Sequence, residues 1–306
     1  MRGETIVRKT PPVSVTEETA HRLLAVAGEQ LDLDVQGAAL IRIGSNAVFR
    51  LQKPVIVRIA RDPGSLDEAR KQVEVARWLE DVGYPATRAL HVEQPVDVEG
   101  HAVTAWESVS KREEYAPIEQ VADLIRRLHT LTPPASLQLP TFDPFGQLDE
   151  RLENLAGIDE NDATFLRDRA AELAEQYEHL SFPIGYGPIH GDANVGNVIL
   201  SEAGDPVLID LDSFAVGPRE WDLVQTALFF DRFGWHTAAE YRTFVNVYGL
   251  DIMTWPGYPI LADYRELAMT GWLAGKACGR HSVAHEVRKR VHAIQTGRSR
   301  REWAPF

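Results

Sequence analysis

Apolar residues follow two different spacings along the chain, and the spacing changes near residue 117. Before that point the apolar runs are short and rich in β-branched residues, which is typical of β-strands. The runs Leu40–Leu51 and Val55–Ala60 predict strands joined through a turn at residues 52–54. Two further strands are expected at Thr87–Glu93 and His101–Glu107, joined across Gly100.

Two segments in this first part carry the signal of a helix start. Ser14 and Glu17 have the spacing of a capping box, and so do Ser65 and Glu68. The first pair predicts a helix that continues to about residue 31. The second pair predicts a helix that continues to about residue 82 and stops at Gly83.

From residue 118 onward the apolar positions recur every three to four residues, as they do on one face of a helix. The first such stripe is Ile118, Val121, Ala122, Ile125 and Leu128. Further helices are expected near residues 159–180, 220–232, 237–248, 258–279 and 282–295. The pattern therefore predicts an α+β protein with a mixed first part, residues 1–108, and a mainly helical second part, residues 109–306.

The composition is that of a folded globular protein. Hydrophobic residues make up 44% of the 306 residues and charged residues 25%, which excludes a disordered or collagen-like chain. The net charge of −13 argues against a nucleic-acid partner, because the phosphates would be repelled. The single cysteine, Cys278, excludes an internal disulfide and a multi-cysteine metal cluster.

The sequence predicts neither a membrane span nor a secretory signal. The first residues lack the apolar run of a signal peptide, and no apolar stretch reaches roughly 18 residues. We therefore expect a cytoplasmic protein without a membrane partner.

The stretch from residue 188 to residue 223 carries the candidate chemistry. His190-Gly191-Asp192 is followed, five positions after the aspartate, by Asn197. The apolar triplets 198–200 and 207–209 flank a turn that contains Gly204 and Asp205, so they are expected to pair as a hairpin. The open end of that hairpin would bring Asn197 beside Asp210, with Asp192 one short loop away.

Oxygen donors of this kind suit Mg²⁺, which takes one or two protein oxygens together with phosphate oxygens and water. Asp192 then stays available to orient a hydroxyl group and to take its proton. This division of labour is the template for phosphoryl transfer. A metal-dependent phosphoesterase is a rival interpretation, although two-metal hydrolases need more histidine and carboxylate ligands than this stretch contains. A polar loop and hairpin without catalytic chemistry is the plainer alternative.

At this point the chain resembles the aminoglycoside phosphotransferase and choline kinase-like family, small-molecule relatives of the protein kinases. The matching motifs are HGDANVGN at 190–197, IDLD at 209–212 and GPREWDL at 217–223. The resemblance implies a bilobal protein-kinase-like fold. Its small β-rich N-lobe would be residues 1–108, and its larger, mainly helical C-lobe residues 109–306. The nucleotide, ATP or GTP, would bind between the lobes.

The resemblance also implies roles for single residues. Asp192 is similar to the catalytic base, and Asn197 and Asp210 are similar to the Mg²⁺ ligands. His190 resembles the residue that supports the catalytic loop, and Asp222 the buried aspartate that accepts hydrogen bonds from the backbone of that loop. The family often has an acidic residue at the position of Asp212, which would be a third ligand or a supporting group.

The N-lobe offers a set of nucleotide-binding candidates. The turn Gly44-Ser45-Asn46 matches the phosphate-covering turn of the family, although a plain hairpin would look the same. Where the family commonly has a lysine on the third strand, this chain has Arg58, which binds phosphate as a fork. The family glutamate that contacts this lysine aligns with Gln72, so either Glu68 substitutes for it or no ion pair forms.

Two further regions complete the expected site. Trp106-Glu107-Ser108 falls where the resemblance places the linker that meets the adenine, although Trp106 could equally pack in the interior. In this family the substrate is bound by the helical lobe after residue 210. Candidates there are Glu220, Asp231, Asp263, Glu266, Trp221, Trp235, Trp255, Tyr258, Tyr264 and Trp272.

The expected function is transfer of the γ-phosphate of ATP or GTP to a hydroxyl group of a small molecule. Acidic residues beside aromatic rings would suit a hydroxylated and cationic acceptor, such as an aminoglycoside-like antibiotic or another amine, with a neutral sugar or nucleoside as the alternative. A metabolite kinase of the same fold is an alternative. So is a non-catalytic nucleotide-binding module, which the changes to Arg58 and Gln72 would favour.

Overall fold

The computed structural model describes residues 15–153, 155 and 157–304, and its chain divides into two compact units. Unit 1 comprises Met1–Glu113 together with Leu200–Asp212. Unit 2 comprises Glu114–Ile199 together with Ser213–Phe306. A short stretch from the middle of the sequence thus belongs to the unit that contains the N-terminal part of the chain.

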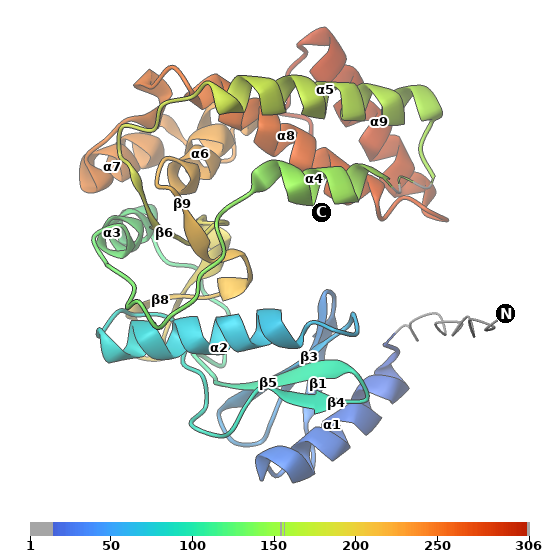
Figure 1. The fold of residues 1–306 in the computed structure, drawn as a ribbon, viewed down its shortest axis with the longest axis vertical. Coiled ribbons are helices and arrows are strands. Elements are labelled where there is room, and N and C mark those ends of the chain that lie inside the picture. The colour runs from blue at the N-terminus through green and yellow to red at the C-terminus, as the bar shows by residue number, and fades with distance from the viewer. Residues whose placement is uncertain (1–14, 154, 156, 305–306) are drawn as a thin grey trace, which may run out of the picture. The chain divides into compact units, whose positions relative to one another are not determined.

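Unit 1 is built on an antiparallel sheet with the strand order β1-β2-β3-β5-β4 (Figure 1). Its strands are β1 (Ala39–Ile43), β2 (Asn46–Arg50), β3 (Val55–Ala60), β4 (Val96–Val98) and β5 (His101–Glu107). The predicted strand at Thr87–Glu93 is wrong, since β4 occupies the place beside β5. The backbone of this segment bonds irregularly instead, with Thr87 N donating to Leu208 O and Leu90 N to Ala105 O.

Helices α1 (Glu17–Leu31) and α2 (Leu66–Asp81) lie on opposite faces of this sheet (Figure 1). Leu23 and Leu24 of α1 pack against Phe49, Val57 and Ile59 of the sheet, and all five side chains are buried. This cluster holds α1 against the strands through burial of apolar surface, which is the main stabilising contribution in a small α/β layer.

Both predicted helices form, but the capping box predicted for Ser65 and Glu68 does not. Thr16 caps α1 by accepting the N–H of Thr19, and Ser14 lies outside the described residues. Ser65 occupies the cap position of α2, but its hydroxyl donates to Asp62 O and makes no cap bond. The spacing of the polar residues therefore marked the helix starts without identifying the bonds that stabilise them.

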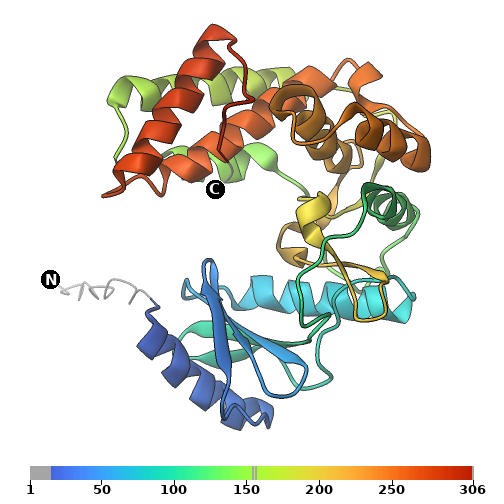
Figure 2. The ribbon, with the colours of Figure 1, turned by 180° about the vertical axis from the view of Figure 1, so that it is seen from behind.

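Unit 2 is mainly helical, as predicted for this part of the chain. Its C-terminal helices α8 and α9, drawn in orange and red, lie beside the green α5 (Figure 2). Helix α4 and the short strands β6 and β9 are additions that the spacing of apolar residues did not indicate. The α-helices of unit 2 are α3 (Ile118–Leu128), α4 (Pro144–Glu153), α5 (Glu160–Glu178), α6 (Trp221–Leu228), α7 (Ala238–Tyr248), α8 (Tyr258–Ala274) and α9 (His281–Thr296).

Two small sheets complete the architecture. Strands β6 (Tyr186–Ile189) and β9 (Ala215–Pro218) pair in antiparallel fashion within unit 2. Strands β7 (Val198–Leu200) and β8 (Pro206–Leu208) form the two-stranded sheet predicted for that stretch. The loop between β6 and β7 carries the HGDANVGN motif, so these strands determine where that motif lies.

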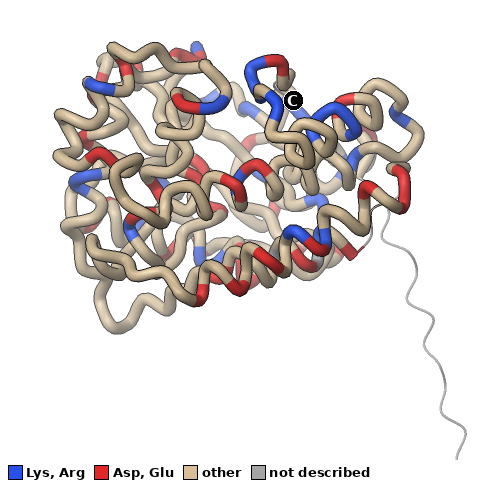
Figure 3. Tube along the Cα trace, turned by 90° about the horizontal axis from the view of Figure 1, so that it is seen from above, with Lys and Arg blue, Asp and Glu red and all other residues tan. Residues whose placement is uncertain are grey.

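Charged residues of both signs are spread over the chain, and basic positions gather around its C-terminal end (Figure 3). Those basic residues are Arg280, Arg288, Lys289, Arg290, Arg298, Arg300 and Arg301. Within residues 15–304, no helix combines the length and the apolar character that crossing a membrane requires.

Candidate active site

The loop after β6 can turn sharply because of Gly191. Its φ of +84° lies in the left-handed region, and an added Cβ would lie 2.3 Å from the carbonyl oxygen of Ser213. Any larger residue would therefore displace either the loop or Ser213. This geometry fixes the backbone immediately before Asp192.

Asp222 accepts hydrogen bonds from the backbone of the same loop. The carboxylate lies in the first turn of α6, is fully buried, and accepts the backbone N–H groups of His190 at 2.7 Å and Gly191 at 2.9 Å. A third bond joins it to Nε2 of His129, at 3.2 Å. Desolvation of the buried carboxyl opposes ionisation, but the hydrogen bond from His129 and the charges of the two histidines lower the pKa of Asp222 overall.

The carbonyl oxygen of Gly191 is held as firmly as its N–H. The indole Nε1 of Trp221 donates to it at 2.8 Å, and Nη2 of Arg265 donates to it at 3.0 Å. The guanidinium of Arg265 also stacks over the Trp221 ring, with Cζ 4.2 Å from the ring centroid. Helices α6 and α8 thus both fix this turn.

The carboxylate of Asp192 is oriented through both of its oxygens. Nδ2 of Asn197 donates to Oδ2 at 3.1 Å and to the Asp192 carbonyl at 2.7 Å, while Nη1 of Arg265 lies 3.3 Å from Oδ1. The side chain of Asp192 nevertheless stays 44% exposed. The buried His190 supports the loop from inside, since its Nδ1 accepts the Asp192 N–H at 3.3 Å. A group with this placement can accept a hydrogen bond from a bound alcohol.

A cavity of about 410 Å³ in unit 2 borders Asp192 and Gly191. Four of the aromatic residues proposed for substrate binding line it, whereas Trp255 and Tyr258 do not. Trp255 donates its Nε1 to Ser181 O, and the hydroxyl of Tyr258 donates to Asp231. The aromatic lining consists of Phe142, Trp221, Trp235, Tyr264 and Trp272, and the basic lining of Arg151, Arg265 and Arg290.

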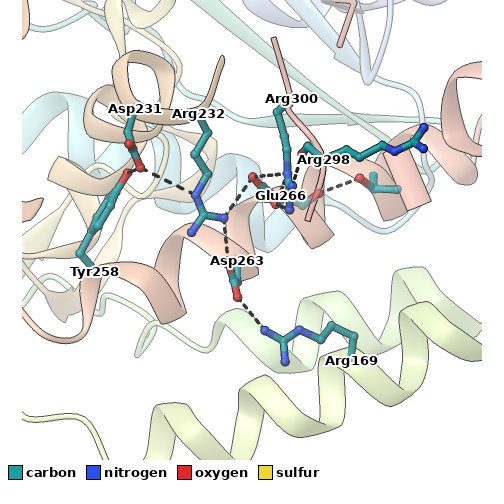
Figure 4. A network of polar contacts seen from close by, with 9 residues as sticks. Arg169, Asp231, Arg232, Tyr258, Asp263, Glu266, Arg298 and Arg300 are labelled. Carbon is teal, nitrogen blue, oxygen red and sulfur yellow. Dashed lines mark hydrogen bonds and ion pairs between the residues drawn. The ribbon is translucent and has the colours of Figure 1, made fainter. Parts of the chain in front are cut away.

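The four acidic residues proposed to contact the substrate do not line this cavity, and each of them forms a hydrogen bond or an ion pair with another part of the protein. Glu220 is buried and accepts the N–H of Ile184 at 2.6 Å. Figure 4 shows the other three in a network of ion pairs and hydrogen bonds. In that network Asp263 pairs with Arg169 and Arg232, the buried Glu266 pairs with Arg232 and Arg300, and Asp231 accepts from Tyr258.

Unit 1 gathers four of the eight nucleotide-binding candidates, and Asp212, around a small pocket of about 130 Å³. Ser45, Asn46, Arg58, Glu68 and Asp212 all line it. Gln72, the residue aligned with the family glutamate, lines it too. Gly44 lies at the adjoining β1–β2 turn, where an added Cβ would meet open space.

Asp212 is the ion-pair partner of Arg58 within the described chain, at 3.7 Å, and Glu68 makes no ion pair with Arg58 there. Lys71 of α2 also reaches this corner, since its Nζ donates to the carbonyl oxygen of Asp212 at 2.5 Å. Desolvation lowers the pKa of Lys71, and the nearby carboxylates of Asp212 and Glu68 oppose that shift. The basic side chains at this pocket are therefore Arg58, Arg61 and the neighbouring Lys71.

Asp210 and Asp212 lie together after β8. Asp210 adopts a φ of +64°, which few non-glycine residues adopt. Desolvation and the neighbouring Asp210 carboxylate raise the pKa of Asp212 to about 6, against the opposing charge of Arg58. Among the residues that the structure describes, no group of three or more His, Cys, Asp or Glu side chains is arranged to hold a metal ion.

Residues 106–108, which were expected to contact an adenine, form hydrogen bonds within unit 1. Trp106 is buried, and its Nε1 donates to the hydroxyl of Thr104 at 2.8 Å. The N–H groups of Glu107 and Ser108 donate to Arg88 O and Pro54 O. Trp106 therefore packs in the interior, which was one of the two interpretations that the sequence left open.

Reasoning from the sequence missed two residues that contact predicted site residues directly. Arg265 contacts Asp192 from 73 positions away, and Lys71 contacts Asp212 from 141 positions away. Lys71 follows Glu68 by one helical turn and precedes Gln72, which was a usable signal for the same face of α2. Arg265 had no such signal, because only packing determines which side of α8 faces the loop.

Comparison with known proteins adds independent information. The sequence profile of a family described as "Phosphotransferase enzyme family" matches residues 40–267. No curated protein sequence matches the chain. Several solved structures are similar to this chain, and because their sequence identities are low, the similarity shows the fold alone.

An amicoumacin kinase in complex with AMP-PNP, Ca²⁺ and its substrate is 13% identical, with a TM-score of 0.70 over 94% of this chain and 98% of that one. A choline kinase from Streptococcus pneumoniae is 17% identical, with a TM-score of 0.64 over 90% and 99%. A spectinomycin phosphotransferase in complex with ADP and spectinomycin is 14% identical, with a TM-score of 0.63 over 90% and 98%. The predicted α+β fold of the protein-kinase-like type is thereby confirmed.

Proposed function

Because the chain belongs to the phosphotransferase enzyme family, we propose that it transfers the γ-phosphate of ATP or GTP to a hydroxyl group of a small molecule, with Asp192 as the base. Two predictions from the sequence, the family and the phosphotransferase class of enzyme, are confirmed by the family match. The roles of single residues, the nucleotide and the acceptor belong to the proposal.

One observation carries the proposal. A half-exposed carboxylate, Asp192, borders a cavity large enough for a small molecule, and its two oxygens are held by Asn197 and Arg265. Pockets of roughly 300–1,000 Å³ are typical of small-molecule sites. A base in a phosphotransferase has to orient the attacking hydroxyl and accept its proton, and an oriented carboxylate at a cavity wall suits that task.

Nucleotide binding is supported by unit 1 and by the neighbours. The amicoumacin kinase binds AMP-PNP and Ca²⁺, and the spectinomycin enzyme binds ADP. In unit 1, hydroxyl and amide groups of Ser45 and Asn46 share a pocket with the guanidinium of Arg58. A fork of guanidinium donors beside a turn is a common way of binding phosphate oxygens. We assign the phosphates to this pocket.

The residues present also fit a divalent cation. The side chains of Asn197 and Asp210 provide neutral and charged oxygen donors, the type that Mg²⁺ prefers. Nδ2 of Asn197 is committed to Asp192, so the amide is oriented with its oxygen free to face a cation. Asp212 would act as a third donor or a supporting group. A bound Mg²⁺ would neutralise charge on the phosphates and align them for transfer.

Two acceptor classes follow from the names of the neighbours. Antibiotics are the substrates of two of them, and choline is the substrate of the third. We therefore propose an antibiotic-modifying enzyme first and a metabolite kinase second. A screen of hydroxylated antibiotics and metabolites for phosphate transfer, run with ATP and with GTP, separates the two.

The test of the base uses Asp192→Asn with an active acceptor from that screen. We expect turnover to fall by about 10²–10⁴-fold, as is typical when a general base is removed. Nucleotide affinity should stay within about twofold, because the base acts mainly in the transition state. Asp168→Asn, an exposed change on α5, is the matched control and should leave both quantities unchanged. If turnover survives while nucleotide affinity collapses, Asp192 is not the base.

A further inference from the structure

The polar part of the Asp192 cavity is dominated by guanidinium groups. Arg151, Arg265 and Arg290 line it, and Asp192 is the one carboxylate among its described lining residues. This charge is opposite to that of the chain as a whole, whose net charge is −13. A cavity with positive walls in an acidic protein selects for an anionic ligand, because the low dielectric of the walls concentrates the local field.

The acidic residues around the cavity are largely committed to other partners. Glu286 neutralises Arg290, with Oε1 3.2 Å from its Nε, and also pairs with Lys289 at 2.6 Å. Asp143, which adjoins the cavity in sequence, accepts the N–H of Gly146 at 3.0 Å. Asp149 is near enough to influence the pKa of Tyr264, as Asp143 is, but neither lines the cavity. Arg151 makes no ion pair with another described residue, whereas Arg265 pairs with Asp192 at 3.3 Å, so these two arginines are the cationic groups that a ligand in the cavity would meet.

Arg265 is positioned to bind an anion next to the reacting hydroxyl. Its guanidinium is 12% exposed, and Nη1 lies only 3.3 Å from Asp192 Oδ1. Its Nε is buried and has no hydrogen-bond partner among the described residues. Stacking on Trp221 holds the fork in place before any ligand arrives.

The rest of the wall suits a planar ring. Trp235 and Trp272 line the cavity and are 37% and 40% exposed, which is unusual for tryptophan. Trp221 and Tyr264 also line the cavity but are themselves buried, and the centroids of their rings lie 5.2 Å apart. Nζ of Lys276 lies 3.2 Å from the centroid of the Trp272 ring, so one face of that indole is already occupied, and the remaining exposed indole surface can stack with a ligand ring.

We propose that the acceptor is an anionic hydroxyl compound with a planar ring, whose carboxylate or comparable anion binds Arg265 and Arg151. The proposal rests on the proposed function, because it takes the Asp192 cavity as the acceptor site. It replaces the cationic acceptor expected from the sequence, because the acidic residues proposed to bind that acceptor already have partners within the protein. Their partners are Arg169, Arg232, Arg300, Tyr258 and the backbone N–H of Ile184.

The test compares three probes with the same hydroxymethyl-substituted ring and a negative, a neutral or a positive group at the 3-position: 3-(hydroxymethyl)benzoate, its neutral benzamide and 3-(aminomethyl)benzyl alcohol. Binding is measured without nucleotide, by quenching of tryptophan fluorescence and by calorimetry. The benzoate should bind at least about tenfold more tightly than the benzamide, as a hydrogen bond to a charged group implies, and the amine should bind most weakly. Equal affinities, or tightest binding of the amine, would overturn the proposal.

Variants then assign the effect to the arginines. Arg265→Gln should remove most of the preference for the benzoate over the benzamide. Because Arg265 also holds the Asp192 loop, the circular dichroism spectrum of the variant is compared with that of the wild type. Arg151→Gln should reduce the preference to a smaller degree, since its side chain is exposed. Arg242→Gln, an exposed change on α7 outside the cavity, is the control. A preference that persists in both cavity variants contradicts the assignment.

Phosphate transfer to the same probes, with ATP and Mg²⁺, is assayed separately. If the benzoate binds selectively but is never phosphorylated by any nucleotide, the proposed function fails while the anion selectivity of the cavity stands. If transfer occurs best to the amine, the function stands and the inference about the acceptor is overturned.

Discussion

Removal of the Asp222 carboxylate should destabilise unit 2 and displace the loop that carries Asp192. The carboxylate is fully buried and accepts two backbone N–H groups, at 2.7 and 2.9 Å, and one histidine nitrogen at 3.2 Å. Asp222→Ala leaves these donors buried without an acceptor. At about 1–3 kcal/mol for each of the two backbone donors, the loss is about 2–6 kcal/mol, with ~4 kcal/mol as the central value.

Asp222→Asn should cost roughly half as much, because one side-chain oxygen still accepts while the new NH₂ faces a donor. The assay is urea denaturation followed by tryptophan fluorescence and by circular dichroism, so that separate unfolding of the two units is detected. Asp168→Ala, on the exposed face of α5, should change the free energy of unfolding by less than ~0.5 kcal/mol.

The same carboxylate predicts a dependence on pH. Because the pKa of Asp222 is lowered in the folded state, the unfolded chain binds the proton more tightly. The contribution of Asp222 is therefore present above the ordinary aspartate pKa of about 3.9 and is lost as the pH falls below it. The difference in stability between the wild type and Asp222→Asn should shrink on acidification. A loss below ~1 kcal/mol for Asp222→Ala at pH 7, or a difference that does not narrow in acid, would refute this account.

Three other changes test separate parts of the molecule. Arg58→Ala should weaken the binding of Mg²⁺–ATP by about 1–3 kcal/mol, because a charged hydrogen bond to phosphate is removed. Calorimetry measures this affinity, and an unchanged value would exclude Arg58 from the phosphate site. Asp210→Ala should abolish phosphate transfer at limiting Mg²⁺, and transfer that persists there would show that Asp210 does not bind the cation. Glu266→Ala leaves the guanidinium groups of Arg232 and Arg300 without their buried partner. The free energy of unfolding measured in urea should therefore fall by about 3 kcal/mol. An unchanged midpoint of unfolding would mean that the network in Figure 4 adds no stability.

Much of the fold could be predicted from the spacing of apolar residues. Long amphipathic segments such as α3, α5 and α7 lie within a few residues of their expected positions. The misses are α4 and three short strands, β4, β6 and β9, and the strands have only three or four residues, which is too few to show a period. Their strands form because a neighbouring strand offers hydrogen-bond partners, which is information from distant parts of the chain.

The sequence by itself determined the loop around Asp192, because its parts are local. Gly191 permits the turn, and Asn197 reaches Asp192 from five positions away. What only the tertiary structure decided is the character of the surrounding cavity. Acidic side chains on helix α8 were expected to face a ligand, but packing directs Asp263 and Glu266 toward arginines from distant segments. It also turns Arg265 toward Asp192. The charge that a helix presents to a cavity depends on which of its faces is buried, and that is set by the packing of the whole unit.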